Sequence, residues 1–503
     1  MEIKGIHIDL KAQMMRFDFL LRTVEELAEM GFNTLLLEYQ DKFPYRGQYA
    51  CLAAPDALTE AQIRQLKTLC QRLNMEIIPM VQCLGHMYWV TRFPAFAPLG
   101  EHYKETGPGS HSLCPSKEDS FRLFRSLAEQ VFDLHRESKY FHIGGDEVKF
   151  SSNCPLCASQ NHGMLLGAYY KNILSFVESN GFIPVMWGDM VVKYEAVAKY
   201  LPPKTLIMDW EYHKGLTASG KQQFYGEAEA FTNTDETAFA NTRHLTDLGF
   251  DVLTAPALRS MGDSCFLPNA IHLDNCVQAF YTANATGAKG ILVTSWSVRR
   301  SPWPLTRPVL WVLSRLFQNP DTTLDTALAD YALHAFGKPD PELGKLPFLL
   351  ALAIRNAKNT GDFVSSGQDF MDPETGMFLS DSTEKRLQGT DIRNNETVRL
   401  AYSQLHHTAL AIKLQLPTAD TEDARWLLWA VDYTLFLSGY VAQLCLRYDD
   451  RNWLLGQLAA FDAFRSHIAI LSEYYTDFSM PSEYQSRIEI HKEYLRSLLA
   501  KNS

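Results

Sequence analysis

Residues 5–39 read GIHIDLKAQMMRFDFLLRTVEELAEMGFNTLLLEY, with a short aliphatic run at each end and a helical pattern between them. In residues 17–31 the apolar positions recur at three- and four-residue spacing, and the pattern ends at Gly31, a suitable helix C-cap. The stretch therefore predicts a strand, an amphipathic helix and a second strand. Such units are typical of a parallel sheet covered by helices.

The same alternation continues to about residue 318. Further strands are expected at EIIPMVQ (76–82), YFHIGGDE (140–147), IPVMWGD (183–189), TLIMDWEY (205–212), FDVLTAP (250–256) and GILVTSW (290–296). Eight strand–helix units in roughly 320 residues fit a closed (β/α)8 barrel, or TIM barrel, better than an open doubly wound sheet. The first strand is not followed by G-x-G-x-x-G, which counts against a dinucleotide-binding fold.

The strand pattern stops after Asn319-Pro320. A Pro- and Gly-rich segment (337–347) and a polar segment (365–391) interrupt sequence that is otherwise helical, including the amphipathic stretch 423–448. The sequence therefore predicts a catalytic barrel domain over residues 1–320 and an α-helical C-terminal domain over residues 321–503.

The composition indicates an ordinary globular protein, with 46% hydrophobic and 21% charged residues in 503. A formal net charge of -11 argues against a nucleic-acid partner, because phosphate binding requires a basic surface. The longest apolar stretch, about residues 346–354, is too short to cross a bilayer. The N-terminal MEIKGIHIDL does not resemble a signal peptide, and the nine cysteines show no disulfide framework. We expect a cytoplasmic protein without nucleic-acid or membrane partners. The sequence gives no information on the oligomeric state.

In a (β/α)8 barrel the active site lies at the carboxyl ends of the strands. The polar and aromatic residues expected there are His7, Asp9, Lys11, Glu38, Asp41, His86, His142, Asp146, Glu147, Trp187, Asp189, Asp209, Trp210, Tyr212, Asp263 and Trp296. Tryptophan rings stack on the apolar face of a sugar, and carboxylates accept hydrogen bonds from its hydroxyls. The combination predicts a carbohydrate site, although each tryptophan taken alone also suits the barrel core.

Asp146 and Glu147 are adjacent carboxylates that follow a strand and two glycines. Repulsion between them is expected to raise one pKa, which would keep a carboxylic acid available to protonate a leaving group. Adjacent residues cannot lie on both faces of a sugar ring, as the nucleophile and acid of a conventional retaining glycosidase do. The pair instead favours a substrate-assisted reaction, in which a 2-acetamido carbonyl attacks C1. On this hypothesis Glu147 is the acid/base and Asp146 holds the acetamido N–H.

Residues 141–148, FHIGGDEV, resemble the H-x-G-G-D-E signature of glycoside hydrolase family 20, the β-N-acetylhexosaminidases. The resemblance narrows to the hexosaminidase D-like branch at HIDLK (7–11), EYQDKFPY (38–45), PMVQCLGHM (79–87), WGDM (187–190) and GILVTSW (290–296). It covers the barrel and implies a retaining exo-enzyme for oligosaccharides with terminal β-linked GlcNAc or GalNAc, with no cofactor required for catalysis.

The resemblance also implies roles for individual residues. Asp146 matches an acetamido-orienting aspartate and Glu147 matches the acid/base glutamate. His86 matches a histidine that relays protons, with Glu38 or Asp41 as its expected acidic partner. Three tryptophans match the walls and floor of the sugar pocket: Trp187, Trp210 and Trp296.

Some features of larger relatives are missing. No arginine follows the first strand, where Asp9 or Lys11 is the expected substitute. The tyrosine after the seventh strand is also missing near Asp263, and Tyr212 is the expected replacement. A W-x-E sequence is absent from the eighth unit. These substitutes, with His142 and the other strand-end residues, are expected to bind substrate, and the gluco or galacto preference is left open.

Cys154, Cys157 and His162 form a C-x-x-C-x4-H sequence just after the Asp-Glu pair. These are three possible ligands for a structural zinc, with His111 or Cys114 as a candidate fourth. The alternative interpretation is a surface loop with unliganded thiols.

Two other functions are compatible with the sequence. A conventional two-carboxylate glycosidase would use Asp9, Glu38, Asp209 or Glu211 as its nucleophile. A non-catalytic sugar-binding barrel would explain the missing arginine and tyrosine. A metal-dependent hydrolase fits least well, because no H-E-x-x-H or H-x-H sequence ends a strand.

Overall fold

Eight parallel strands close into a barrel in the computed structural model, which describes residues 1–11, 14–101, 108–212, 238–260, 267–268, 270–296, 301–360, 369–371, 378–380, 392–477 and 480–501. The strands are β1 (Ile3–Asp9), β2 (Thr34–Glu38), β3 (Glu76–Met80), β4 (Tyr140–His142), β5 (Ile183–Trp187), β6 (Leu206–Trp210), β7 (Asp251–Ala255) and β9 (Gly290–Ser295). They follow chain order, and β9 pairs with β1 to complete the circle. A short strand, β8 (Ala257–Arg259), pairs with β9. The predicted (β/α)8 barrel is confirmed.

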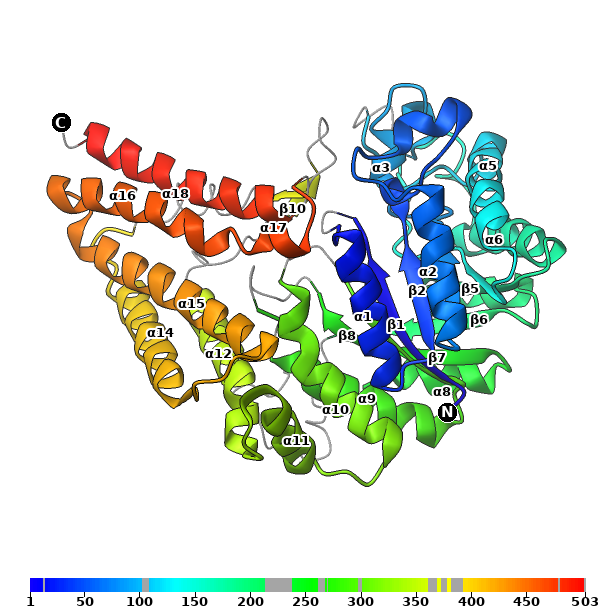
Figure 1. Ribbon diagram of the computed structural model, residues 1–503. Helices are drawn as coiled ribbons and strands as arrows, with labels where there is room; N and C mark the ends of the chain where they lie inside the picture. Colours follow the sequence, from blue (N-terminus) through cyan, green and yellow to red (C-terminus); the bar gives the residue numbers. More distant parts are fainter. Residues whose placement is uncertain are drawn as a thin grey trace.

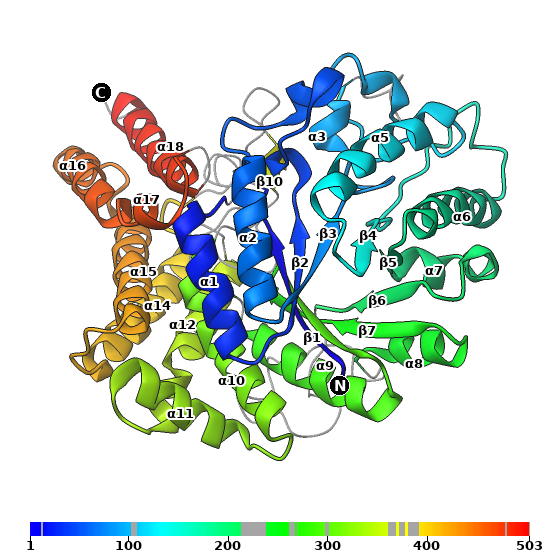
Figure 2. The ribbon, with the colours of Figure 1, turned by 45° about the vertical axis from the view of Figure 1, so that its right-hand side comes forward.

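Helices cover the outside of the barrel (Figures 1 and 2). They are α1 (Phe17–Glu29), α2 (Glu60–Arg72), α3 (Tyr88–Thr91), α5 (Glu118–Leu134), α6 (His162–Ser179), α7 (Asp189–Lys193), α8 (Ala240–Asp247) and α9 (Ile271–Thr286). Short 3-10 helices lie in the loops: η1 (Gln40–Lys42), η2 (Gly47–Leu52), η3 (Ala97–Leu99), η4 (Glu195–Tyr200) and η8 (Trp303–Thr306). The start of α2 shows why a helix begins there, because the side chains of Thr59 and Gln62 form a reciprocal capping box.

The alternation of side chains along each strand decides which residues reach the barrel mouth. In β6, Leu206 and Met208 belong to the cluster inside the barrel, while Ile207 belongs to the core under the helices. The same alternation places Trp210 inside the barrel and turns Asp209 outward, toward α8.

After the barrel the described chain is mostly helical, with α10 (Arg307–Gln318), α11 (Leu324–Phe336), α12 (Pro341–Thr360), α14 (Glu396–Gln415), α15 (Glu422–Arg447), α16 (Arg451–Ile468), α17 (Leu471–Tyr474) and α18 (Met480–Lys501). A pair of short strands, β10 (Asp369–Met371) and β11 (Phe378–Ser380), interrupts the helices. Figure 1 shows α14 to α18 on the side of the barrel where α1 and α10 lie. The helical character of this region is confirmed, and the domain boundary at residue 320 stays a prediction. None of the described helices is both long and apolar enough to cross a membrane.

A buried arginine joins the barrel to this helical region. Arg307, the first residue of α10, contacts both oxygens of Glu26 on α1 at 2.6 and 3.1 Å. It also contacts Glu422 and Asp423 at the start of α15, at 2.6 and 3.8 Å. Burial of a guanidinium is unfavourable, but these three carboxylates offset it and raise the pKa of Arg307 further above its ordinary value.

We expect Arg307→Ala to lower the free energy of unfolding by about 3–5 kcal/mol, because it removes the buried cation shared by the partly buried carboxylates of Glu26, Glu422 and Asp423. Arg136→Ala is the matched control, since it removes an exposed arginine that pairs with exposed Asp133 and should cost about 1 kcal/mol or less. Chemical denaturation followed by circular dichroism measures both changes. Equal effects of the two substitutions would contradict a joining role for Arg307.

Candidate active site

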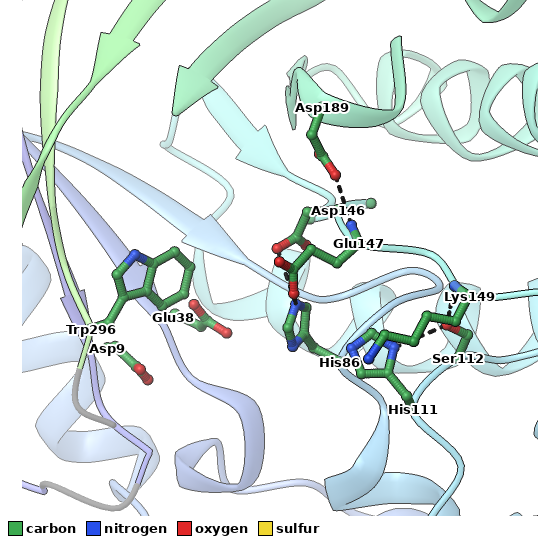
Figure 3. Close-up of polar contacts among 12 residues, drawn as sticks. Asp9, Glu38, His86, His111, Ser112, Asp146, Glu147, Lys149, Asp189 and Trp296 are labelled. Atoms are coloured by element: carbon green, nitrogen blue, oxygen red, sulfur yellow. Dashed lines mark hydrogen bonds and ion pairs between the residues drawn. The ribbon is translucent and has the colours of Figure 1, made fainter. Parts of the chain in front are cut away.

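The loops that follow β1 to β5 carry the charged residues of the barrel mouth. Figure 3 shows two groups there: His86, Asp146 and Glu147 lie together, and Asp9 and Glu38 lie apart from them near Trp296. These residues come from strand ends far apart in the sequence. They meet because the carboxyl ends of parallel strands gather at one face of a barrel.

The imidazole of His86 lies between the two adjacent carboxylates. Its Nε2 is 3.2 Å from Oδ2 of Asp146 and 3.2 Å from Oε2 of Glu147. Burial alone would lower the pKa of His86, but the two carboxylates raise it to about 10. At neutral pH the site therefore holds an imidazolium between carboxylates. The acidic partners of His86 are the pair itself, whereas the sequence predicts Glu38 or Asp41.

Glycines allow the loops that carry these groups to approach each other. A Cβ added at Gly85 would lie 2.1 Å from the backbone carbonyl oxygen of Asp146, so only glycine fits beside the pair. Gly144 has a φ of 66°, in the left-handed region that glycine adopts freely. His86 and Glu147 also have left-handed backbones, with φ of 53° and 49°, which costs on the order of 1 kcal/mol each. Such strain is retained where the surrounding structure fixes functional side chains.

A third carboxylate, Asp189, supports the pair. It begins α7 directly after β5, and its Oδ2 accepts a hydrogen bond from the backbone N–H of Glu147 at 2.9 Å. Burial and the nearby Asp146 raise the pKa of Asp189 to about 7. The hydrogen bond from His86 lowers the pKa of Glu147, although burial opposes this. The sequence predicts a raised pKa within the Asp-Glu pair. For Glu147 this prediction is wrong, because it rests on repulsion between the two carboxylates and omits the imidazolium of His86.

The two carboxylates of the pair differ in accessibility. The side chain of Glu147 is 49% exposed, whereas that of Asp146 is 7% exposed. Oδ1 of Asp146 is buried and accepts no hydrogen bond from any described residue. A buried carboxylate oxygen without a donor is costly, so this atom is suited to accept a hydrogen bond from a ligand.

The three tryptophans meet inside the barrel mouth. Trp187 is fully buried, and its ring centroid is 5.7 Å from that of Trp296. Trp210 stacks on Tyr212 with centroids 5.1 Å apart. The indole N–H of Trp296 donates to Oη of Tyr212 at 2.9 Å. The structure thus brings these four aromatic residues together.

Away from the pair, Lys11 compensates the charge of two buried carboxylates. Its Nζ is 2.9 Å from Oδ2 of Asp9 and 3.6 Å from Oε1 of Glu38, and it lies over the ring of Trp296. Nε2 of His7 is 3.1 Å from Oε2 of Glu38. Burial raises the pKa of Glu38, but Lys11 and His7 lower it overall to well below its usual range.

Other predicted strand-end carboxylates do not join these groups. Asp209 faces the helices, where it accepts a hydrogen bond from Oγ1 of Thr242 at 2.6 Å, and burial raises its pKa to about 6. It therefore lies on the wrong face of β6 to be the nucleophile of a conventional glycosidase. Asp41 lies in η1, 4.0 Å from Nζ of Lys42. Asp263 lies outside the described residues.

His142 supports the turn that carries the pair. Its Nδ1 accepts a hydrogen bond from the backbone N–H of Gly144 at 2.9 Å. Burial lowers the pKa of His142 to about 3, so the ring is neutral and its proton is on Nε2. The ring packs against Trp187, with centroids 4.7 Å apart.

The cysteine cluster differs from the predicted ligand set. Cys154 and Cys157 lie next to Cys114 and Glu101, and one possible ligand atom from each is within 4.8 Å of the others. His162 does not belong to this group; it is the first residue of α6, and its ring stacks on Phe150 at 4.0 Å. The sequence places Cys114 as a candidate fourth ligand, but Glu101 carries no motif that reveals it.

Comparisons with known proteins agree with this geometry. Residues 2–227 match the glycosyl hydrolase family 20 catalytic domain. Hexosaminidase D from Homo sapiens is 30% identical over 231 residues, covering 44% of this chain and 47% of that protein. Hexosaminidase D from Bos taurus is 28% identical over 236 residues, covering 43% of this chain and 64% of that protein. The match thus spans about half of the human relative and less than two thirds of the bovine one.

A solved crystal structure of a beta-N-acetylhexosaminidase shares the fold, with a TM-score of 0.50 and 16% sequence identity over 67% of this chain and 78% of that chain. The family match includes both adjacent carboxylates, His86 and Asp189. Residues 2–227 of this chain therefore resemble the catalytic domain of glycosyl hydrolase family 20, and the curated relatives they match are hexosaminidase D proteins.

Proposed function

We propose that this chain is a retaining exo-β-N-acetylhexosaminidase that removes terminal β-linked GlcNAc or GalNAc from oligosaccharides. The observation that carries the proposal is the buried Oδ1 of Asp146, which accepts no hydrogen bond from the described residues although the carboxylate lies beside Glu147 and His86. An acetamido N–H supplies the donor that this oxygen needs. The names of the hexosaminidase D relatives support the same substrate class.

In the first step, the acetamido carbonyl oxygen attacks C1 and the glycosidic bond breaks. Glu147 protonates the departing oxygen, while Asp146 binds the acetamido N–H and stabilises the positive oxazolinium ion. In the second step, water attacks C1, Glu147 takes a proton from the water and the oxazolinium ring opens. Two inversions at C1 give overall retention, and no cofactor takes part.

His86 gives Glu147 its proton in this mechanism. Because the pKa of His86 is raised and that of Glu147 is lowered, the resting pair carries one proton, held on the imidazole. The 3.2 Å contact allows this proton to move to Glu147 as the leaving-group oxygen takes one up. Asp189 fixes the backbone of Glu147 during both steps.

The partly exposed rings of Trp210 and Trp296 suit the apolar face of the sugar, and the fully buried Trp187 packs beneath them in the barrel core. Oη of Tyr212 accepts the indole N–H of Trp296, and its hydroxyl is the proposed donor to the acetamido oxygen. The remaining polar residues proposed to bind the sugar hydroxyls are Asp9, Lys11, Glu38 and Asp263. Asp41, which lies apart from these groups, and the fully buried His142 are not included. We also propose a cytoplasmic location, because the cysteines of the sequence show no disulfide framework.

A conventional nucleophile is less consistent with the site. Asp9 and Glu38 are buried in an ion-pair network with Lys11, which reduces their nucleophilicity. Asp209 faces away from the mouth. These three carboxylates are thus disfavoured, which leaves Glu211 as the enzyme alternative to the acetamido group of the substrate.

The test of this function compares aryl β-GlcNAc, aryl β-GalNAc and aryl β-glucoside at mildly acidic pH. We expect turnover of at least one acetamido sugar and little of the glucoside, because only the former carries the internal nucleophile. Glu147→Gln should lower kcat roughly a hundred- to ten-thousand-fold, and more for a sugar leaving group than for nitrophenol. Glu129→Gln, on the exposed face of α5, is the matched control.

Equal turnover of the glucoside would contradict the substrate-assisted mechanism and favour an enzyme nucleophile. Binding of GlcNAc without turnover of any substrate would instead support a sugar-binding barrel.

The second prediction concerns pH. In the His86→Gln variant the proton has no imidazole to hold it, and the pKa of Glu147 rises from its lowered value toward the ordinary one. The protonated acid is then present only at low pH, so the alkaline limb of kcat/KM should move to lower pH. We expect a loss of about tenfold to a hundredfold near pH 7 and a smaller loss near pH 5, from steady-state kinetics across pH.

The exposed histidine substitution His244→Gln should leave the pH profile unchanged. If His86→Gln lowers activity by the same factor at every pH, the histidine has a structural role and no part in proton transfer.

A further inference from the structure

A second cluster of ionisable side chains lies next to the barrel mouth, outside the proposed sugar pocket. It consists of Glu101, Cys114, Cys154 and Cys157, all of which are buried. Sγ of Cys114 is 3.4 Å from Sγ of Cys157 and 4.0 Å from Sγ of Cys154. Oε2 of Glu101 is 3.4 Å from Sγ of Cys157. Three thiols and a carboxylate thus converge on one point.

The spacing of these atoms matches the coordination shell of zinc. Zinc binds thiolates at about 2.3 Å and carboxylates at about 2.0–2.2 Å in a tetrahedron, which places two sulfurs about 3.8 Å apart and a sulfur and an oxygen about 3.5 Å apart. The observed separations of 3.4 to 4.0 Å lie around these values. A disulfide needs sulfurs about 2.05 Å apart, so no pair is bonded here.

We propose that Glu101, Cys114, Cys154 and Cys157 bind one structural zinc ion. Four protein ligands fill the tetrahedron and leave no position for water or substrate, which is typical of a structural site. Zinc binds thiolates, so the three thiols release their protons to solvent on binding. The cation also offsets the cost of burying Glu101 among thiols and apolar side chains.

Backbone hydrogen bonds hold the four ligands in place. Cys154 and Cys157 form a C-x-x-C turn, in which the N–H of Ala158 donates to the carbonyl of Cys154 at 3.0 Å. Glu101 and Cys114 lie on facing antiparallel segments, joined by the bridge between residues 100 and 113. The backbone N–H of Glu101 donates to the carbonyl oxygen of residue 112, and the backbone N–H of Cys114 donates to the carbonyl oxygen of residue 99, both at 2.8 Å. These hydrogen bonds hold the backbone of all four residues around one point.

An apolar and hydrogen-bonded shell surrounds the ligands. Phe150 and Leu165 pack against the three cysteines. Oγ of Ser116 lies 3.2 Å from Sγ of Cys157 and also accepts a hydrogen bond from Gln160 at 3.2 Å. A shell of this kind excludes water and orients the ligands, as around other metal sites.

The ion would fasten together two loops of the barrel mouth. Cys154 and Cys157 lie in the loop that follows Glu147, and Cys114 follows the segment that carries His111. The ring of His111 is 4.6 Å from that of His86. Zinc would therefore fix the loop on one side of Glu147 without touching a reacting atom.

The experiment is elemental analysis of the full chain, purified without added metal or chelator. We expect about one zinc per wild-type chain, and less than about a tenth for Cys154→Ser/Cys157→Ser. Glu101→Gln keeps the thiols and should weaken zinc binding in a competition with a chromogenic chelator. His162→Ala and Cys51→Ser are the matched controls and should retain the full content, since neither residue belongs to the cluster.

Because the double cysteine variant can fail to fold, wild-type protein provides an independent test. After chelation the melting temperature should fall and recover on addition of zinc, and cobalt should give the intense visible bands of a tetrahedral thiolate site. Wild-type zinc below about a tenth of an equivalent, or cobalt bands of octahedral type, would overturn the proposal. A full zinc content in the folded double cysteine variant would overturn it as well.

Discussion

The contact of one imidazolium with two carboxylates is the interaction on which the rest of the site depends. Asp146 and Glu147 are neighbours in sequence and would repel each other if both were ionised and unpaired. His86 lies 3.2 Å from each and removes most of that repulsion. The arrangement strains the backbone, since both His86 and Glu147 have left-handed φ values. It also requires a residue without a side chain at Gly85. Asp189 then fixes the Glu147 backbone from a third loop.

The mouth of the barrel contains two charged groups, which differ in whether their carboxylates are already paired. Around His86 the carboxylates retain unfilled capacity to bind a ligand, because Oδ1 of Asp146 accepts no hydrogen bond from the described residues. Around Lys11 the carboxylates are already paired with the ammonium. Under the proposed function, the group around His86 is the reactive side of the mouth and the group around Lys11 is its binding side. This division explains why several acidic residues at strand ends need not all be catalytic.

Much of the fold could be predicted from sequence, because hydrophobic periodicity and the eight strand segments are local signals. The H-x-G-G-D-E stretch likewise identifies the two carboxylates. Contacts between loops were harder to predict. His86 pairs with Asp146 and Glu147 and not with Glu38 or Asp41, because Gly85 lacks a side chain and lets the loop after β3 approach the loop after β4. The prediction of a raised pKa for Glu147 is wrong for the same reason, because it omits the contact with His86.

Residues whose position depends on strand alternation or on contacts between distant loops were also hard to predict from the sequence. Asp209 and Trp210 both end β6, yet only Trp210 faces the mouth, and one residue of register decides this. Glu101 has no motif and joins the cysteines only because residues 100 and 113 form an antiparallel bridge. Sequence spacing pointed to Cys154 and Cys157, with Cys114 as a candidate from another loop, whereas His162, the third expected ligand, lies outside the cluster.

The helical region contributes to the mouth from outside the barrel. The segment after α17 pairs with the chain between β1 and α1, where Tyr475 bridges to Met15 and the N–H of Thr476 donates to Met14. That connection begins just after Lys11, the cation of the binding side. The cysteine–glutamate cluster holds the loop after Glu147 on the other side. Each half of the mouth is thus supported by structure that lies outside the eight strands, so its geometry depends on tertiary contacts as much as on the barrel itself.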